Sequence, residues 1–172
     1  MIYYFLIQRI KTHKRLELLL KREVVEGFTI LELLTVIAIV GALSAIAIPA
    51  YTDYIEKAKE TRAIADILML ERDIGAYEMT NETLPASLDD VGRGSFEDPW
   101  GNPYQYLNFA KVKGKGKGKM RKDRFLVPIN STYDLYSMGK DGKSSSPLTA
   151  RSSYDDIIRA NDGGYIGPAH SY

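Results

Sequence analysis

A run of 23 residues, from Phe28 to Ala50, constrains this chain more than any other feature, because it is built almost entirely of apolar and small side chains. Glu32 is its only ionisable residue. As a helix rising about 1.5 Å per residue, the run would span about 34 Å, enough to cross a hydrocarbon core about 30 Å thick. The sequence therefore predicts one membrane-spanning helix with a carboxyl group near its start, a costly position for a charge without a partner.

The residues before this run suggest which side of the membrane they occupy. Residues 1–27 carry six basic and three acidic side chains, a net charge of +3, which favours retention in the cytoplasm. No A-x-A site follows the apolar run, so cleavage behind it by the ordinary signal peptidase is not expected. The Gly27-Phe28 junction is instead the expected cleavage site. The alternative is an uncleaved signal anchor in which the Glu32 carboxylate reaches back to the interface.

Gly27, Phe28, Glu32, the apolar helix and Pro49 near its end resemble the N-terminus of type IV pilins and type II secretion pseudopilins. This resemblance implies that a prepilin peptidase cuts after Gly27 and methylates the new N-terminal residue, Phe28. It also implies that Glu32 meets the N-terminal amine of a neighbouring subunit during assembly. A free α-amine is mostly cationic at neutral pH, so it would supply the partner that Glu32 lacks in a lone membrane helix.

Residues 51–172 predict one globular domain of the α+β class. Apolar residues recur at spacings of three and four beyond Pro49, which predicts an amphipathic continuation of the membrane helix packed on a small antiparallel sheet. Pro49 itself predicts a kink or a locally melted turn. A groove-binding helix is the functional alternative. The apolar stripe consists of Ala63, Ile67, Leu70, Ile74 and Tyr77.

The rest of the domain shows turn and strand signals. Thr83–Val91 predicts a loop and a short helix, and Asp98–Tyr106 predicts a turn that leads into a strand. Further strands are expected at Phe125–Ile129 and Tyr133–Ser137, with a C-terminal loop after them. The basic repeat Lys113–Lys119 predicts a mobile hairpin tip; contact with an acidic partner or a neighbouring subunit is its functional alternative.

Composition narrows the function classes. After the expected cut, 17 basic residues face 19 acidic ones, so overall charge suggests no nucleic-acid partner. The chain has no cysteine, so no disulfide can close the C-terminal loop. Both histidines, His13 and His170, lie near the termini, and no nucleophile motif is present. We therefore expect a structural protein and not an enzyme.

Asp98–Tyr106 resembles, nearly residue for residue, a turn of the major pseudopilin of type II secretion systems. The resemblance implies a subunit that polymerises with copies of itself at the inner membrane of a Gram-negative bacterium, spanning it once with the C-terminal domain in the periplasm. Its implied partners are the prepilin peptidase, the minor pseudopilins and the inner-membrane assembly platform, and its implied task is to drive export of folded proteins across the outer membrane. A type IV pilus subunit and a monomeric membrane-anchored calcium-binding module are the alternatives.

The stretch Asp134–Gly142 resembles a calcium-binding loop of the same pseudopilin. The resemblance implies a Ca²⁺ site, and Ca²⁺ takes six to eight oxygen ligands. Residues 142–155 are longer than the usual connection, and a solvated turn with an exposed aspartate pair is the alternative. The implied ligands are the carbonyls of Met138 and Lys143 and the carboxylates of Asp141, Asp155 and Asp156.

Overall fold

The structure is a computed structural model that describes residues 27–172, apart from the side chains of Lys115 and Lys117. The predicted leader, except for Gly27, lies outside the described residues. The chain divides into two compact units between Ile48 and Pro49.

Helix α2, Ile30–Asn81, carries the apolar run in its first half. It is the one helix in the described part of the chain that is long and apolar enough to cross a membrane, and its most apolar stretch is not buried. Its large side chains stand exposed along this half, from Ile30 at 80% to Ile48 at 64%. Such a surface requires a membrane or other copies to cover it.

The helix continues through Pro49, so of the two alternatives predicted there the melted turn is wrong, whereas the kink stays a prediction. Proline removes one backbone donor, and the remaining hydrogen bonds on either side keep the 52-residue helix intact. The Thr52 hydroxyl donates to the Pro49 carbonyl oxygen at 2.7 Å.

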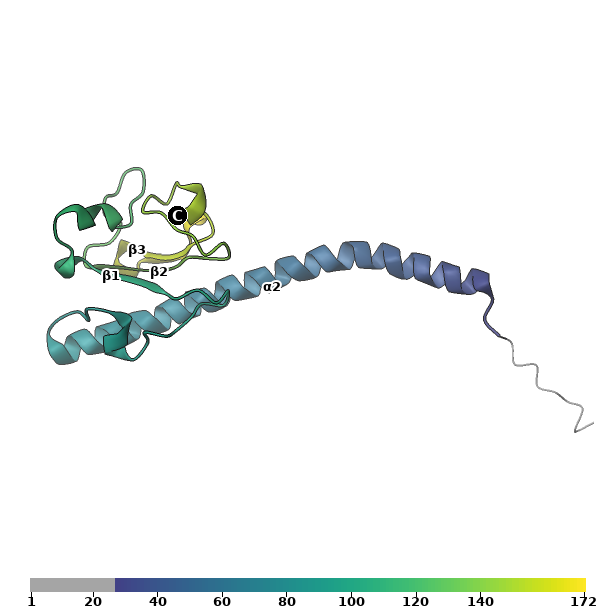
Figure 1. The fold of residues 1–172 in the computed structure, drawn as a ribbon, viewed down its shortest axis with the longest axis horizontal. Coiled ribbons are helices and arrows are strands. Elements are labelled where there is room, and N and C mark those ends of the chain that lie inside the picture. The colour runs from purple at the N-terminus through teal and green to yellow at the C-terminus, as the bar shows by residue number, and fades with distance from the viewer. Residues whose placement is uncertain (1–26) are drawn as a thin grey trace, which may run out of the picture. The chain divides into compact units, whose positions relative to one another are not determined.

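Four short antiparallel strands form one sheet in the second unit, in the order β1-β2-β3-β4. β1 is Gln105–Asn108, β2 is Tyr133–Ser137, β3 is Ile157–Ala160 and β4 is Tyr165–Pro168. Figure 1 shows β1, β2 and β3 lying over the second half of α2. The predicted α+β, pilin-like arrangement of a long helix on a small antiparallel sheet is confirmed.

The main core lies between the helix and the sheet. The predicted stripe faces inward, and its first four residues are fully buried, whereas Tyr77 at its end is half-buried. A second, smaller cluster covers the other face of the sheet. Because side chains alternate along a strand, Ile157 of β3 joins the first cluster and Ile158 the second. The second cluster contains Ile129, Leu148, Ile158, Ala160 and Ala169.

A long-range ion pair ties the last part of the chain to the helix. Arg159 of β3, which is 5% exposed, donates from Nε to Oε1 of Glu71 on α2 at 2.7 Å. Its guanidinium also lies over the Tyr133 ring, 4.2 Å from the centroid. Burial raises the pKa of Tyr133 to about 12, so the ring stays neutral beneath the cation.

The strand predicted at Phe125–Ile129 is wrong, because this stretch is irregular. Pro128 cannot donate to a strand ladder, and Phe125 stands 90% exposed. Ile129 alone enters the core, held by its N–H to the Arg121 carbonyl at 3.0 Å. The sheet is completed instead by β3 and β4, which are formed by short apolar segments near the C-terminus.

The basic repeat lies in the connection between the paired antiparallel strands β1 and β2, as expected for a hairpin, and forms a 3-10 helix, Gly114–Lys119. After it, the chain runs beside the loop that follows β2. The Lys122 N–H donates to the Ser146 carbonyl at 3.0 Å, and the Leu148 N–H donates to the Lys122 carbonyl at 2.9 Å. These two backbone bonds form a parallel bridge between Lys122 and Pro147.

Candidate functional site

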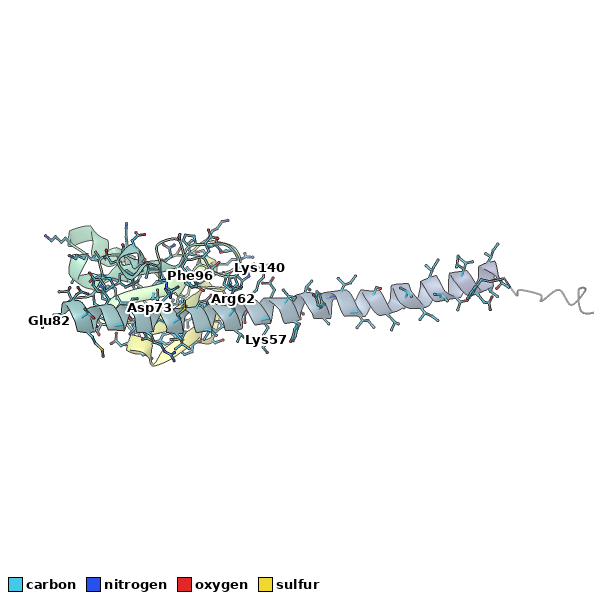
Figure 2. All side chains as sticks on the ribbon, turned by 90° about the horizontal axis from the view of Figure 1, so that it is seen from below. Lys57, Arg62, Asp73, Glu82, Phe96 and Lys140 are labelled. Atoms are coloured by element: carbon cyan, nitrogen blue, oxygen red, sulfur yellow. The ribbon has the colours of Figure 1, made fainter. Side chains whose placement is uncertain are left out.

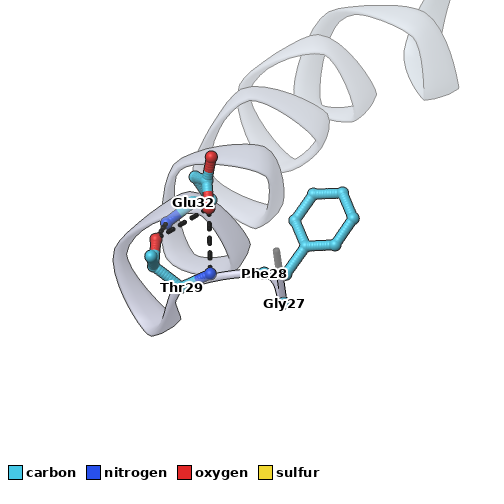
Figure 3. A pocket seen from close by; sticks show the side chains of 4 residues that line it. All are labelled: Gly27, Phe28, Thr29 and Glu32. Carbon is cyan, nitrogen blue, oxygen red and sulfur yellow. Dashed lines mark hydrogen bonds between the residues drawn. The ribbon is translucent and has the colours of Figure 1, made fainter. Parts of the chain in front are cut away.

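The start of α2 is the first candidate site. Gly27, Phe28, Thr29 and Glu32 line a shallow pocket there (Figure 3). The Thr29 N–H and hydroxyl both donate to Oε2 of Glu32, each at 2.9 Å, and the Glu32 N–H donates to the Thr29 hydroxyl at 3.1 Å. This reciprocal pair is a capping box, in which N-cap and third-residue side chains satisfy each other's backbone donors.

The capping box gives Glu32 a local role that the sequence analysis missed. Its signal, Thr followed three residues later by Glu at the start of an apolar run, is present in the sequence. The carboxylate also lies where the helix dipole favours negative charge. Glu32 is therefore held in place by its own helix within a single chain.

A second candidate site joins the two stretches that resemble the pseudopilin. Asp98 Oδ1 accepts from the backbone N–H groups of Trp100 and Asn102, at 3.0 and 2.8 Å, which fixes the turn. Asp98 Oδ2 accepts from the Ser137 hydroxyl at 2.5 Å, and the Asn102 side chain donates to the Gly139 carbonyl at 2.8 Å. The turn and the C-terminal loop are thus one packed unit.

Both stretches also contact the helix through Glu56. Trp100 Nε1 donates to Oε2 of Glu56 at 3.0 Å, and Lys140 Nζ lies 3.3 Å from its Oε1. The Trp100 hydrogen bond and, to a lesser extent, Lys140 lower the pKa of the Glu56 carboxyl. Figure 2 shows Lys140 beside α2. One carboxylate on the helix therefore positions both the turn and the loop.

Two of the predicted calcium ligands lie close together in the loop after β2. The Asp141 N–H donates to Oδ2 of Asp155 at 3.0 Å, and Oδ1 of Asp141 accepts from the Lys143 N–H at 2.8 Å. Gly139 adopts a φ of +64°, and a Cβ there would lie 2.3 Å from the Asp155 carbonyl oxygen. A residue without a side chain is therefore required where the loop passes Asp155.

Asp156 points elsewhere. It is fully buried, and its Oδ2 accepts from the guanidinium of Arg121 and from the Ser144 hydroxyl, the latter at 2.6 Å. Burial raises the pKa of the Asp156 carboxyl, and Arg121 is the main opposing influence. Sequence reasoning missed Arg121 because it follows the Gly-Lys repeat, where a basic residue reads as one more solvated charge.

The predicted ligand set fits a calcium ion poorly in this arrangement. Within residues 27–172, no group of three or more acidic or histidine side chains is placed to hold a metal ion. Asp141 and Asp155 lie together, whereas the carboxylate of Asp156 is already paired with a cation. Calcium binding by Met138, Asp141, Lys143, Asp155 and Asp156 stays a prediction.

Comparison with known proteins gives the family. No family model matches the chain, and no solved structure matches it. The type II secretion system core protein G of Aeromonas hydrophila is 30% identical over 141 residues, which cover 70% of this chain and 86% of the relative. The chain belongs to the type II secretion system core protein G family. The family predicted from the Asp98–Tyr106 turn and the Asp134–Gly142 loop is confirmed.

Further relatives agree with this assignment. The core protein G of Vibrio cholerae is 29% identical over 145 residues, covering 72% of this chain and 86% of the relative. The type IV major alpha-pilin of Moraxella bovis is 55% identical over 78 residues, covering 42% of this chain and 49% of the pilin. Core protein G and pilins thus share a superfamily, and the apolar half of α2 makes this member a membrane-anchored protein. The relatives are structural proteins, which is consistent with the expectation of no enzymatic activity.

Proposed function

We propose that this chain is the structural subunit of a type II secretion pseudopilus, which polymerises at the inner membrane and drives export of folded proteins across the outer membrane. The observation that carries this proposal is the exposed first half of α2 in a member of the core protein G family. Burial of these side chains, worth about 25 cal/mol per Å², would hold the subunit first in the membrane and then in the core of the filament.

We propose that prepilin peptidase cuts between Gly27 and Phe28 and that Phe28 is then methylated. The geometry supports this because α2 begins only at Ile30, so the bond between Gly27 and Phe28 lies in non-helical backbone. A protease needs extended backbone, and residues 27–29 lie outside the helix. The Phe28 side chain, 83% exposed, is also free for recognition.

After this cut, Glu32 would lie one helical turn from the new N-terminus. Its carboxylate accepts hydrogen bonds from Thr29, and among residues 27–172 it forms no ion pair. The cationic amine of a neighbouring subunit would supply the missing charge in an apolar filament core. The capping box would then present the carboxylate in a fixed position for this contact.

We propose a single-pass orientation with residues 1–27 in the cytoplasm and residues 51–172 in the periplasm of a Gram-negative bacterium. The net charge of +3 before the helix supports it. The partners would be further copies of the chain, the prepilin peptidase, the minor pseudopilins and the inner-membrane assembly platform.

N-terminal sequencing of the protein from its native membrane, combined with deletion of the gene, tests the proposal. We expect a mature chain that starts with N-methylated Phe28, and loss of exoprotein secretion in the deletion strain. A type IV pilus subunit, the alternative favoured by the Moraxella bovis relative, would be processed identically. Loss of twitching motility with normal secretion would establish that alternative. An unprocessed N-terminus would instead favour a monomeric membrane-anchored module.

A further inference from the structure

Membership of the core protein G family does not explain why the side chain of Arg121 is buried. It lies two residues after the Gly-Lys repeat, among exposed basic side chains, yet its own side chain is only 2% exposed. Removing a charge from water costs several kcal/mol unless partners compensate it. The surroundings of Arg121 must therefore be built to accept a cation.

The partners of the guanidinium come from three parts of the domain. One Nη donates to Oδ2 of Asp156, and the other donates to the Ser144 hydroxyl and, at 2.7 Å, to the Ser145 carbonyl. The group also lies over the Tyr136 ring, 4.2 Å from the centroid. A planar donor group surrounded by a carboxylate, a hydroxyl, a carbonyl and a ring face is a dedicated site for arginine.

Two polar atoms in this cluster have no hydrogen-bond partner among the described residues, Nε of Arg121 and Oδ1 of Asp156. They are the second donor and the second acceptor of the same ion pair. Arginine and carboxylate groups commonly pair through two parallel hydrogen bonds. The two unpartnered atoms are thus the donor and the acceptor that a second, parallel hydrogen bond of this ion pair would use.

The segment with the Gly-Lys repeat and the long loop 142–155 meet at this cluster. The segment that contains the Gly-Lys repeat delivers Arg121, and the long loop 142–155 delivers Ser144 and Ser145. The segments are also joined directly by the two backbone bonds of the Lys122–Pro147 bridge and by the Ser146 hydroxyl, which donates to the Gly118 carbonyl at 2.9 Å. Both segments thus contribute to the same set of contacts.

This arrangement also accounts for the adjacent acidic residues Asp155 and Asp156. Their charges would repel without compensation, and a divalent cation is one way to supply it. Here Arg121 compensates Asp156, while Asp155 accepts from the Asp141 N–H. A calcium ion that used Asp156 would have to displace the guanidinium or lie beside it, and both cost free energy because like charges repel in a buried site.

We propose that Arg121 is an internal cation that replaces bound calcium in closing the C-terminal loop of this chain. The loop closes, and the domain folds, through a guanidinium that is part of the polypeptide. This inference goes beyond the proposed function and does not depend on it, because it concerns the folding of the domain and not its assembly.

The first experiment uses the full chain in detergent micelles and needs no variant. Thermal unfolding is followed by circular dichroism and Trp100 fluorescence in millimolar CaCl₂ and in millimolar EGTA, and ⁴⁵Ca²⁺ binding is measured by equilibrium dialysis. We expect the same midpoint in both solutions and no stoichiometric binding at submillimolar Ca²⁺. A midpoint several degrees lower in EGTA, with one Ca²⁺ bound per chain, would overturn the proposal.

Variants then test whether the ion pair of Arg121 stabilises the closed loop. Arg121→Ala leaves Asp156 buried and unpaired, so we expect a midpoint lower by roughly 5–10 °C, whereas the exposed Lys119→Ala should change it by no more than about 1 °C. Asp141→Ala loses only the acceptor of the Lys143 N–H and should lower the midpoint by less than about 4 °C. The double variant Arg121→Met with Asp156→Asn removes both charges and should recover much of the loss. The proposal would be wrong if Arg121→Ala had the same midpoint as the wild type. It would also be wrong if Asp141→Ala destabilised the domain as much as Arg121→Ala.

Discussion

Thr29 and Glu32 hold each other across the first turn of α2: the Thr29 N–H and hydroxyl both donate to the Glu32 carboxylate at 2.9 Å, and the Glu32 N–H donates to the Thr29 hydroxyl at 3.1 Å. Glu32 therefore has two separable properties, a capping side chain and a negative charge. Glutamine keeps the first and loses the second, because its carbonyl oxygen can still accept the two bonds.

We predict that Glu32→Gln and Glu32→Ala both insert into the membrane and fold but fail to assemble. The reason is that only a carboxylate can compensate the amine of a neighbouring subunit in an apolar core. The measurement is crosslinking in membranes, scored as the ladder of multimers. Thr29→Ala is the matched control that removes the capping hydroxyl and keeps the charge. If Glu32→Gln assembled normally and Thr29→Ala did not, the cap and not the charge would be the assembly determinant.

The apolar stripe of α2 predicts a sharp contrast between neighbouring leucines. Leu70→Ala should destabilise the domain by about 2–5 kcal/mol, because the side chain is fully buried against the sheet and its loss leaves a cavity. Leu68→Ala, at a position 41% exposed, should cost less than about 1 kcal/mol. Chemical denaturation of the full chain in detergent measures both. Equal losses would mean that the stripe does not face the sheet in solution.

Gly139→Ala should destabilise the C-terminal loop by about 2 kcal/mol or more. Alanine is strained at a φ of +64°, and its Cβ would meet the Asp155 carbonyl oxygen at 2.3 Å. Gly118→Ala is the control, since a Cβ there has open space around it. Limited proteolysis of the loop and the unfolding midpoint report the effect. A stable, protease-resistant Gly139→Ala protein would show that the loop takes another path.

The stability of the domain should fall in acid partly through Asp162. The Ser131 N–H and hydroxyl both donate to its carboxylate, at 2.8 and 2.7 Å, and the pKa of Asp162 is lowered chiefly by the backbone N–H. Because the folded-state pKa lies below the unfolded one, this stabilisation is present above the unfolded pKa, about 3.9, and is lost as pH falls through the folded pKa. The effect is modest, since the side chain is 47% exposed and screened by solvent.

Unfolding midpoints measured from pH 6 down to pH 2.5 test this. Asp162→Asn should lose stability at pH 6 and show a flatter dependence on pH below about pH 4 than the wild type. Asp53→Asn, at an exposed helix position, should retain the wild-type profile. Parallel curves for the wild type and Asp162→Asn would exclude this contribution.

Trp100 should report on the turn that positions the C-terminal loop. Glu56→Ala removes the acceptor of the indole N–H, bonded at 3.0 Å, and should cost about 1 kcal/mol with a shift in Trp100 emission. Lys140→Ala, at a side chain 65% exposed, should change stability by less than about 0.5 kcal/mol and leave the emission unchanged. An unchanged emission in Glu56→Ala would mean that the indole N–H has another acceptor.

The helix and its buried face were predictable because they repeat a pattern: apolar residues at spacings of three and four identify Ala63, Ile67, Leu70 and Ile74 without knowledge of the partner surface. The strands were harder to predict. Phe125–Ile129 is apolar enough to suggest a strand, but Pro128 interrupts its donors, and the true β3 contains Arg159, whose charge is compensated by Glu71 far away in the sequence.

The contacts of the C-terminal loop were also hard to predict from the sequence. The resemblance to the pseudopilin identified Asp141, Asp155 and Asp156 as one group of calcium ligands. Their contacts in the structure differ, because among the described residues Asp156 pairs with a cation and the other two do not. The Asp156 carboxylate lies against Arg121, 35 residues earlier, and nothing local in either segment indicates the other. The Thr29–Glu32 box, by contrast, is encoded within four residues and was predictable in principle.

The ion pair between Glu71 and Arg159 joins residues 88 positions apart, and β4 lies later still. Until β3 and β4 have been synthesised, the apolar stripe of α2 has no complete sheet to cover it. The domain therefore closes only after these two strands have been made, long after α2 itself. Deletion of β3 or β4 should act as a folding defect of the whole domain, although these strands lie far in sequence from the apolar half of α2.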